Sequence, residues 1–187
     1  MLGQLFHAVL RQSRKRAELE TDSQQDLVTG MHSRRHAQRL IDDLWRSPPE
    51  HENRGVLLLI DLNEFKRIND TCGHPMGDIA LRHVAQVLEK NLRRSDVISR
   101  WGGDEFLVWL PALSGTSAMT VAEQLRVSVA ESNPAIAGFA TGLRISVGAT
   151  PVPDTDSFAA ALDRADRALM RAKQNGRNCV VVARPGA

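Results

Sequence analysis

The sequence predicts an α/β, or α+β, domain in which helices cover both faces of a central mixed sheet of about five strands. Three observations support this fold class. Short apolar runs typical of strands alternate along the chain with segments of helical periodicity. One run, GVLLLIDL, is apolar almost throughout, as in a strand buried on both faces. Two other runs are joined by Gly102 and Gly103, which predicts an antiparallel hairpin within the sheet.

Bulk composition narrows the class of protein. The chain has 187 residues, which suits one domain and an appendage, and its 24 basic and 22 acidic side chains give no support for bulk nucleic-acid binding. Cys72 and Cys179 stand in no metal-ligand or redox spacing, which fits a reducing cytoplasm. The longest wholly apolar run, Val56–Ile60, is far shorter than the roughly 20 residues of a membrane-spanning helix. We therefore expect a cytoplasmic protein without a direct membrane span, with any membrane sensor outside this chain.

Residues 1–21 are predicted to form an N-terminal amphipathic helix, ahead of a domain at 22–187. The apolar residues recur at spacings of three and four: Leu2, Leu5, Phe6, Val9 and Leu10. The basic run Arg11–Arg16 is interpreted as a solvated helix face, with a membrane or nucleic-acid contact as the alternative. This segment is expected to act as a linker or signalling helix.

The domain is predicted to start with a helix at about His32–Trp45, which ends before the Pro-Pro pair that follows. The buried strand GVLLLIDL comes next. A loop and a short helix then occupy NEFKRINDTCGHPMGD, where Gly73, Pro75 and Gly77 are interpreted as breaks in regular structure.

A second helix is predicted from about Asp78 to Leu92. Four of its apolar residues are expected to face inward: Ile79, Val84, Val87 and Leu88. The strands DVISRW and EFLVWL follow and flank the Gly-Gly turn of the hairpin.

The last third of the chain is predicted to alternate helices and strands. A helix at about Ser117–Ser132 precedes the strand LRISVGAT. A further helix is capped near Ser157 and closed by Gly176, and the strand NCVVVA ends the domain.

Acidic residues lie where a buried strand and the hairpin meet. Asp61 ends the apolar strand, and Asp104 and Glu105 lie at the turn of a hairpin that can be its neighbour. Carboxylates brought together at strand ends are unfavourable unless a cation neutralises them, and Mg²⁺ prefers such oxygen ligands and works with phosphates. The alternatives are a polar turn at Gly102–Glu105 and a strand-end cap at Asp61.

Polar residues after these acids suit a nucleotide. Lys66 and the neighbouring turn amides can hold a phosphate, and Asn69 with Asp78 can match the polar edge of guanine. The alternative is that Asn69 and Asp78 are helix caps. Lys173 and Arg177 stand four apart near the end of a helix, where they can simply complement its dipole.

Four stretches together resemble the GGDEF-domain diguanylate cyclases: DLVTGMHSRR, DLNEFKRINDTCGHPMGD, RWGGDEF and ADRALMRAKQNGRN. The resemblance extends from about Asp26 to Asn178. It implies a sheet like the palm of polymerases and nucleotidyl cyclases. It also implies condensation of two GTP into cyclic di-GMP, with release of two pyrophosphates.

The resemblance also implies roles for individual residues. Asp61, Asp104 and Glu105, with the Leu62 carbonyl, would hold Mg²⁺ or Mn²⁺, and Asp104 or Glu105 would help to deprotonate the attacking hydroxyl. Gly102 and Gly103 would let the backbone approach the nucleotide closely. The residues expected to bind substrate, with Asn69 and Asp78 on guanine and the cationic ones on phosphates, are Phe65, Lys66, Asn69, Asp78, Lys173 and Arg177.

Further implications concern assembly and control. A two-fold symmetric product requires two sites that face each other, so we expect a homodimer regulated by an upstream sensory domain or partner. Arg93 and Asp96 resemble the family's inhibitory RxxD site for cyclic di-GMP, with a surface Arg-Asp pair as the alternative. Ser33, Asn63 and Met170 depart from the family pattern. The rival functions are a non-enzymatic nucleotide receptor and a cyclase with another product.

Overall fold

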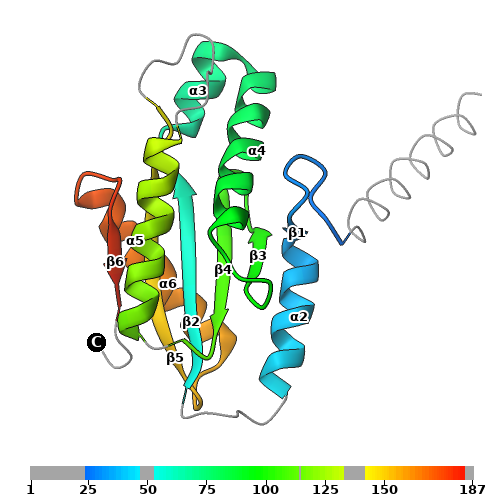
Figure 1. The fold of residues 1–187 in the computed structure, drawn as a ribbon, viewed down its shortest axis with the longest axis vertical. Coiled ribbons are helices and arrows are strands. Elements are labelled where there is room, and N and C mark those ends of the chain that lie inside the picture. The colour runs from blue at the N-terminus through cyan, green and yellow to red at the C-terminus, as the bar shows by residue number, and fades with distance from the viewer. Residues whose placement is uncertain (1–23, 47–52, 114, 133–141, 184–187) are drawn as a thin grey trace, which may run out of the picture.

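The fold is described for residues 24–46, 53–113, 115–132 and 142–183 of a computed structural model (Figure 1). The helix predicted at 1–21 and the Pro-Pro pair at 48–49 lie outside these ranges. None of the helices within them combines the length and apolarity that crossing a membrane would require.

The centre of the domain is a mixed sheet of six strands, in the order β1-β3-β4-β2-β5-β6. The β1/β3 and β5/β6 pairs are parallel, and the other pairs are antiparallel. This confirms the predicted mixed sheet and the hairpin at Gly102–Gly103. The strands are β1 His32–Ser33, β2 Asn53–Leu62, β3 Val97–Arg100, β4 Glu105–Pro111, β5 Ile145–Pro153 and β6 Val180–Val182.

The strand β1 corrects the predicted start of the first helix. His32 and Ser33 pair with Ser99 and Arg100 of β3, and the helix begins only at Arg34. A two-residue strand is too short to produce an alternating pattern, so the sequence carries no periodic signal for it.

The described residues form five helices: α2 Arg34–Arg46, α3 Phe65–Cys72, α4 His74–Lys90, α5 Gly115–Glu131 and α6 Phe158–Gln174. Helix α3 packs against α4 at the end of the sheet (Figure 1). Ser157 caps α6 as predicted, since its side chain accepts a hydrogen bond from the Ala160 amide. Helix α4 begins four residues before the predicted start, because Pro75 fits its first turn. Gly77 and Asp78 therefore lie inside a helix, and the interpretation of Gly77 as a break was wrong.

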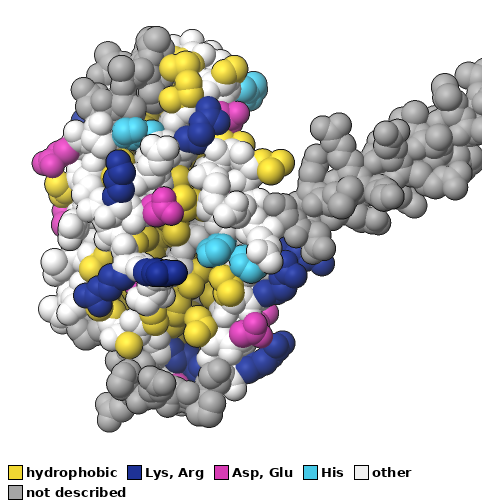
Figure 2. All heavy atoms as spheres, turned by 45° about the vertical axis from the view of Figure 1, so that its right-hand side comes forward, with side chains coloured by type: hydrophobic (Ala, Val, Ile, Leu, Met, Phe, Trp, Pro, Cys, Tyr) yellow, Lys and Arg dark blue, Asp and Glu magenta, His cyan; other side chains and the backbone are white. Residues whose placement is uncertain are grey.

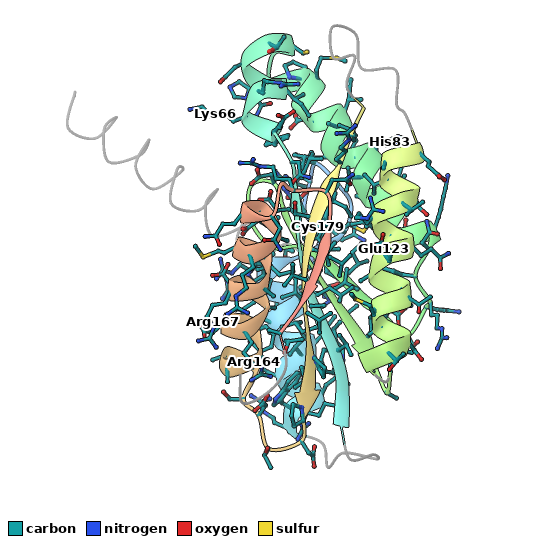
Figure 3. All side chains as sticks on the ribbon, turned by 90° about the vertical axis from the view of Figure 1, so that its left-hand side faces the viewer. Lys66, His83, Glu123, Arg164, Arg167 and Cys179 are labelled. Carbon is teal, nitrogen blue, oxygen red and sulfur yellow. The ribbon has the colours of Figure 1, made fainter. Side chains whose placement is uncertain are left out.

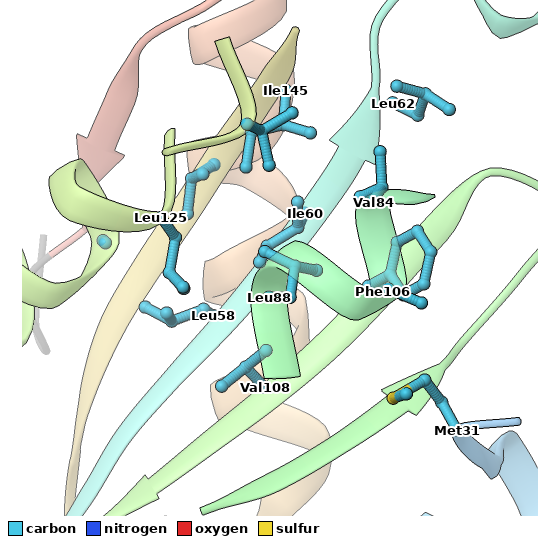
Figure 4. Close-up of a cluster of buried hydrophobic side chains, with 14 of the residues drawn as sticks. Met31, Leu58, Ile60, Leu62, Val84, Leu88, Phe106, Val108, Leu125 and Ile145 are labelled. Atoms are coloured by element: carbon cyan, nitrogen blue, oxygen red, sulfur yellow. The ribbon is translucent and has the colours of Figure 1, made fainter. Parts of the chain in front are cut away.

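Helices cover both faces of the sheet, as predicted. Leu58 and Ile60 of β2 pack in a core with Val84 and Leu88 of α4 and Leu125 of α5 (Figure 4). The alternate residues of β2 pack in a second core with residues of α2 and α6. Strand β2 is thus buried on both faces, which explains its apolar sequence.

The inward face of α4 differs in part from the prediction. Val84 and Leu88 are fully buried, but Ile79 is 40% exposed. Small residues, Ala80 and Ala85, take part of the inward face instead. Alanines add little to a hydrophobicity pattern, so the pattern did not reveal that they face inward. The prediction that Ile79 faces inward was wrong.

The surface in Figure 2 carries basic and acidic side chains interspersed with apolar ones. The balanced net charge of +2 is thus also mixed locally on this face.

Candidate active site

The end of β2 brings two predicted metal ligands side by side. Asp61 pairs directly with Glu105 of β4 and, on its other side, with Ser146 of β5. Side chains of directly paired residues point to the same face of a sheet, so both carboxylates face α6. Asp61 is 8% exposed although it is charged. The predicted meeting of the strand and hairpin acids is confirmed for this pair.

Lys173 in the last turn of α6 completes this arrangement. Its Nζ atom lies 2.5 Å from Oδ2 of Asp61. The ammonium group thus occupies the position where a cation would neutralise the carboxylate. Complementing the helix dipole does not account for this contact, because Asp61 belongs to a strand 112 residues away in sequence.

Burial dominates the electrostatics of the two acids. It raises the pKa of Asp61, although Lys173 partly offsets this effect. Burial also raises the pKa of Glu105, with Lys173 again opposing and the neighbouring acids reinforcing the shift. A raised pKa means that burial makes the ionised form of each acid less favourable here than in water.

Asp104 lies in the turn next to these acids. Its charge adds to the rise in pKa of both Asp61 and Glu105. Its backbone carbonyl accepts a hydrogen bond from the Leu62 amide at 3.0 Å, which ties the hairpin turn to the end of β2. In the part of the chain that the structure describes, three side chains of the Asp, Glu, His or Cys type do not converge as a ready-made metal cluster. The donor set fits Mg²⁺ in chemistry, with Lys173 holding one carboxylate.

The two glycines of the turn serve different needs. A Cβ atom added to Gly102 would lie 3.0 Å from Oε2 of Glu105, so this glycine leaves room for the carboxylate. A Cβ added to Gly103 would meet nothing within 4 Å. Packing among the described residues therefore does not require glycine at Gly103. The adjacent Trp101 anchors the turn, since it is buried against Phe158 of α6.

Arg100 is a feature of the site that sequence reasoning missed. Its guanidinium group donates to the carbonyls of Gly102 and Gly103, the latter at 2.7 Å from Nη2. It also donates to both carboxylate oxygens of Asp26, at 3.2 and 3.1 Å. Asp26 accepts further hydrogen bonds from Thr29. The signature turn is therefore fixed to the segment that leads into the domain.

Asp26 differs electrostatically from the strand-end acids. Burial alone would raise its pKa, but hydrogen bonds from Thr29 and the charge of Arg100 together lower the pKa below the ordinary value. This carboxylate is thus stabilised in its ionised form. The sequence separation of 74 between Asp26 and Arg100 explains why no local pattern predicts the pair.

The predicted guanine-binding residues lie on α3 and α4. Asn69 is inside α3 and Asp78 is inside α4, so neither is the N-cap of its helix. Oδ1 of Asn69 is buried and has no hydrogen-bond partner among the described residues. A Cβ atom on Gly77 would come within 1.9 Å of that oxygen, so glycine allows α4 to approach the amide. The structure thus rejects the cap interpretation for both residues.

The remaining predicted substrate residues surround this corner unevenly. Phe65 is half-buried at the start of α3, near Gly77. Lys66 is exposed and projects from α3 (Figure 3). Arg177 follows α6 in a left-handed conformation with φ of 64°, and its charge acts on Asp61. Arg177 and Lys173 therefore both belong to the carboxylate part of the site.

Arg93 and Asp96 form a local turn. The side chain of Asp96 accepts a hydrogen bond from the Arg93 amide at 2.8 Å, and the Asp96 amide donates to the Arg93 carbonyl. Asp96 therefore contacts the backbone of Arg93, while Arg93 itself is exposed.

The chain is similar to known proteins of one family. A family model described as "Diguanylate cyclase, GGDEF domain" matches residues 23–179. The chain belongs to the GGDEF family. It is 35% identical over 184 residues to diguanylate cyclase DgcM of Escherichia coli, which covers 96% of this chain but 43% of DgcM. The chain thus spans less than half the length of that relative.

Solved structures of GGDEF proteins share the fold. Diguanylate cyclase SiaD of Pseudomonas aeruginosa, solved in complex with its activator SiaC, matches with a TM-score of 0.79 and 33% identity, over 97% of this chain and 76% of that chain. The GGDEF domain of DgcB from Caulobacter crescentus, solved in complex with c-di-GMP, matches with a TM-score of 0.80 and 27% identity. That match covers 86% of this chain and 96% of the DgcB domain. The mixed sheet and its helices are therefore those of the family.

Proposed function

We propose that this GGDEF domain is a diguanylate cyclase that condenses two GTP into cyclic di-GMP and releases two pyrophosphates. The observation that carries the proposal is the direct pairing of Asp61 with Glu105 beside Lys173. A buried acid and a half-buried acid, both with raised pKa values, together with the cationic side chain of Lys173, suit a metal-dependent phosphoryl-transfer site.

Asp61 and Glu105 would hold Mg²⁺ or Mn²⁺, with Asp104 and the Leu62 carbonyl beside them. When bound, the metal would neutralise charge on the triphosphate and on the leaving pyrophosphate. Lys173 would then leave Asp61 and contact phosphate together with Arg177 and Lys66. One of Asp104 and Glu105 would take the proton of the attacking 3′-hydroxyl. Gly103, which the fold leaves open, would admit the nucleotide.

Recognition of guanine is assigned to Asn69 and Asp78. The unpartnered Oδ1 of Asn69 is an acceptor that suits a donor of the guanine edge, and the Asp78 carboxylate accepts from a second donor. Phe65 would support the base from α3. These contacts favour guanine over adenine, which presents a different donor and acceptor pattern.

Each site would hold one GTP, so the reaction requires two chains. Every 3′-oxygen in the product is joined to the other nucleotide's phosphate, and two sites must therefore face each other in a homodimer. Residues 1–21 would align the two domains under control of an upstream sensory domain or a partner. The SiaD–SiaC complex is a precedent for partner control in a relative. We place the reaction in the cytoplasm, where GTP is found and free thiols such as Cys72 persist.

A receptor that binds the nucleotide without converting it is the rival function. Receptors of this fold usually carry a damaged signature, whereas Gly102–Glu105 is intact here. The test is to incubate the full chain with GTP and Mg²⁺ over a series of protein concentrations and to detect product by mass. We expect cyclic di-GMP, formed at a rate that rises more steeply than the protein concentration. A strictly monomeric variant with full specific activity at high dilution would refute the dimer.

We also propose that Arg93 and Asp96 bind cyclic di-GMP as an inhibitor. The exposed guanidinium group of Arg93 is available for a guanine edge or a phosphate, because Asp96 contacts the Arg93 backbone. We expect Arg93→Ala to leave initial turnover unchanged and to weaken inhibition by added cyclic di-GMP. Unchanged inhibition in this variant would contradict the assignment.

A further inference from the structure

A polar pocket of about 160 Å³ lies next to the end of β2. Three segments of the chain meet there: the loop after β2, the residues before β5 and the turn after α6. The lining residues are Asn63, Glu64, Gly142, Arg144, Gly176, Arg177 and Asn178. The side chains of Asn63 and Arg144 have no part in the reaction described above.

The orientation of the Asn63 side chain is fixed. It is 7% exposed, and its Oδ1 accepts a hydrogen bond from Ser146 Oγ at 2.7 Å. Ser146 Oγ in turn accepts from the Asn178 amide at 3.2 Å. The remaining polar atom of Asn63, Nδ2, is a buried donor without a partner among the described residues. Buried donors are nearly always satisfied in proteins, so this amide suits a ligand that accepts hydrogen bonds.

A backbone hydrogen bond holds Arg144 next to Asn63. The backbone N–H of Asn63 donates to the Arg144 carbonyl at 2.9 Å. Arg144 comes directly before β5 and lines the same pocket as Arg177, whose charge acts on Asp61. Arg144 is exposed and therefore has room to bind a ligand at the mouth of the pocket.

The charges around the pocket favour an anion. Arg144 and Arg177 both line it. A guanidinium group can donate two parallel hydrogen bonds to the oxygens of one phosphate. The one acidic residue in the lining, Glu64, is paired with Arg67 at 3.1 Å. Two arginines and an unsatisfied amide donor thus face a pocket that adjoins the proposed triphosphate site.

We infer that this pocket binds the terminal phosphate of the nucleoside triphosphate and that Arg144 makes the site discriminate triphosphate from diphosphate. The inference rests on the proposed function, since it extends that site by one phosphate. Free pyrophosphate has the same chemistry, so the released product would bind there as well.

The test measures binding to the full chain by calorimetry in the presence of Mg²⁺. GTP, GDP and pyrophosphate are titrated in three separate experiments. Arg144→Ala removes a charged hydrogen-bond donor. We expect it to weaken the binding of GTP and of pyrophosphate by about tenfold, and the binding of GDP by less than about twofold. Arg144→Lys should recover part of the loss. Arg46→Ala is the matched control, because Arg46 is an exposed arginine at the end of α2, and it should change none of the three affinities.

Equal weakening of GTP and GDP by Arg144→Ala would overturn the inference, as would unchanged binding of both GTP and pyrophosphate. The assay needs no turnover, so it separates two failures. A chain that binds triphosphate through Arg144 but makes no cyclic di-GMP would refute the proposed function and leave this inference intact.

Discussion

Two regions of the candidate site are built in different ways. The carboxylate end, comprising Asp61, Glu105 and Lys173, is built by strand pairing and one helix-to-strand ion pair. The helical corner, comprising Asn69, Gly77 and Asp78, is built by the close approach of α3 and α4. The first region holds carboxylates whose pKa values are raised by burial, and the second holds a neutral acceptor without a donor among the described residues.

This difference assigns separate tasks to the two regions. Carboxylates whose charge is disfavoured by burial can bind a metal, so the carboxylate end should determine the rate of chemistry. An unpaired acceptor fixed in a helix can read a base edge, so the helical corner should determine which nucleotide is used. Substitutions in one region should therefore affect kcat, and substitutions in the other should affect KM and selectivity.

The largest expected effect is that of Glu105→Gln. The substitution removes a proposed metal ligand while keeping the shape of the side chain, so turnover should fall by at least about 100-fold. Thermal denaturation without Mg²⁺ should show no loss of stability, because burial disfavours the charge that is removed. Comparable turnover in the variant and the parent would show that the carboxylate end is not the reacting centre.

Gly77→Ala tests the helical corner. The new Cβ atom would lie 1.9 Å from Oδ1 of Asn69 and would displace the amide. Losing a specific base contact of this kind should raise KM for GTP and reduce the preference for GTP over ATP by about 10- to 100-fold, with a smaller change in kcat. Steady-state kinetics with both nucleotides measure this.

One kinetic result for Gly77→Ala would contradict the division between a recognition region and a chemical region. Alanine is favourable inside a helix, so Gly77→Ala should not unfold α4. A variant that lost kcat while keeping KM and base preference would mean that the helical corner acts on the chemistry and not on recognition.

Arg100→Lys should have a moderate effect on the carboxylate end. Lysine keeps the charge but cannot bridge the turn carbonyls and Asp26 with a planar fork. We expect kcat to fall by about tenfold through a looser signature turn, with little change in KM. Arg167→Lys is the matched control, because Arg167 forms an exposed pair with Asp163 on α6 (Figure 3). Equal effects of both variants would show that Arg100 has no special role in positioning.

The smallest expected effect concerns stability and pH. The folded-state pKa of Glu105 is raised, so the folded protein binds its proton more tightly than the unfolded chain. Ionised Glu105 therefore lowers the free energy of unfolding at neutral pH, and this penalty disappears as pH falls through the raised pKa. In urea denaturation without Mg²⁺, the stability gap between Glu105→Gln and the parent should narrow over that range. A gap independent of pH would contradict the burial of this charge.

Asp26 should show the opposite sign. Its pKa is lowered in the folded protein, so its ionised form stabilises the fold above the ordinary carboxyl pKa. That stabilisation is lost only as pH falls through the lowered value. The two acidic positions thus respond to acid at different pH and in opposite directions.

Local signals predicted much of this architecture. The apolar run before Asp61, the Gly-Gly turn and the cap at Ser157 each act within a few residues, and all three are confirmed. The meeting of Asp61 with Glu105 followed from placing the hairpin next to the buried strand.

Contacts between distant segments were out of reach of such signals. Lys173 meets Asp61 across 112 residues and Arg100 meets Asp26 across 74. The role of Gly77 was also missed, because the need for glycine comes from Asn69 on another helix and not from local backbone geometry. Sequence patterns report the element that a residue belongs to, whereas these contacts depend on how the elements pack.

The most direct test of the two-region account is the identity of the product made from an equimolar mixture of GTP and ATP with Mg²⁺. Mass analysis over a series of protein concentrations would report both regions at once, since bond formation depends on the carboxylate end and base choice on the helical corner. We predict cyclic di-GMP as the main product, and its loss in Glu105→Gln. Retention of bound GTP without any cyclic dinucleotide at every concentration, or a product that contains adenine as readily as guanine, would contradict the account.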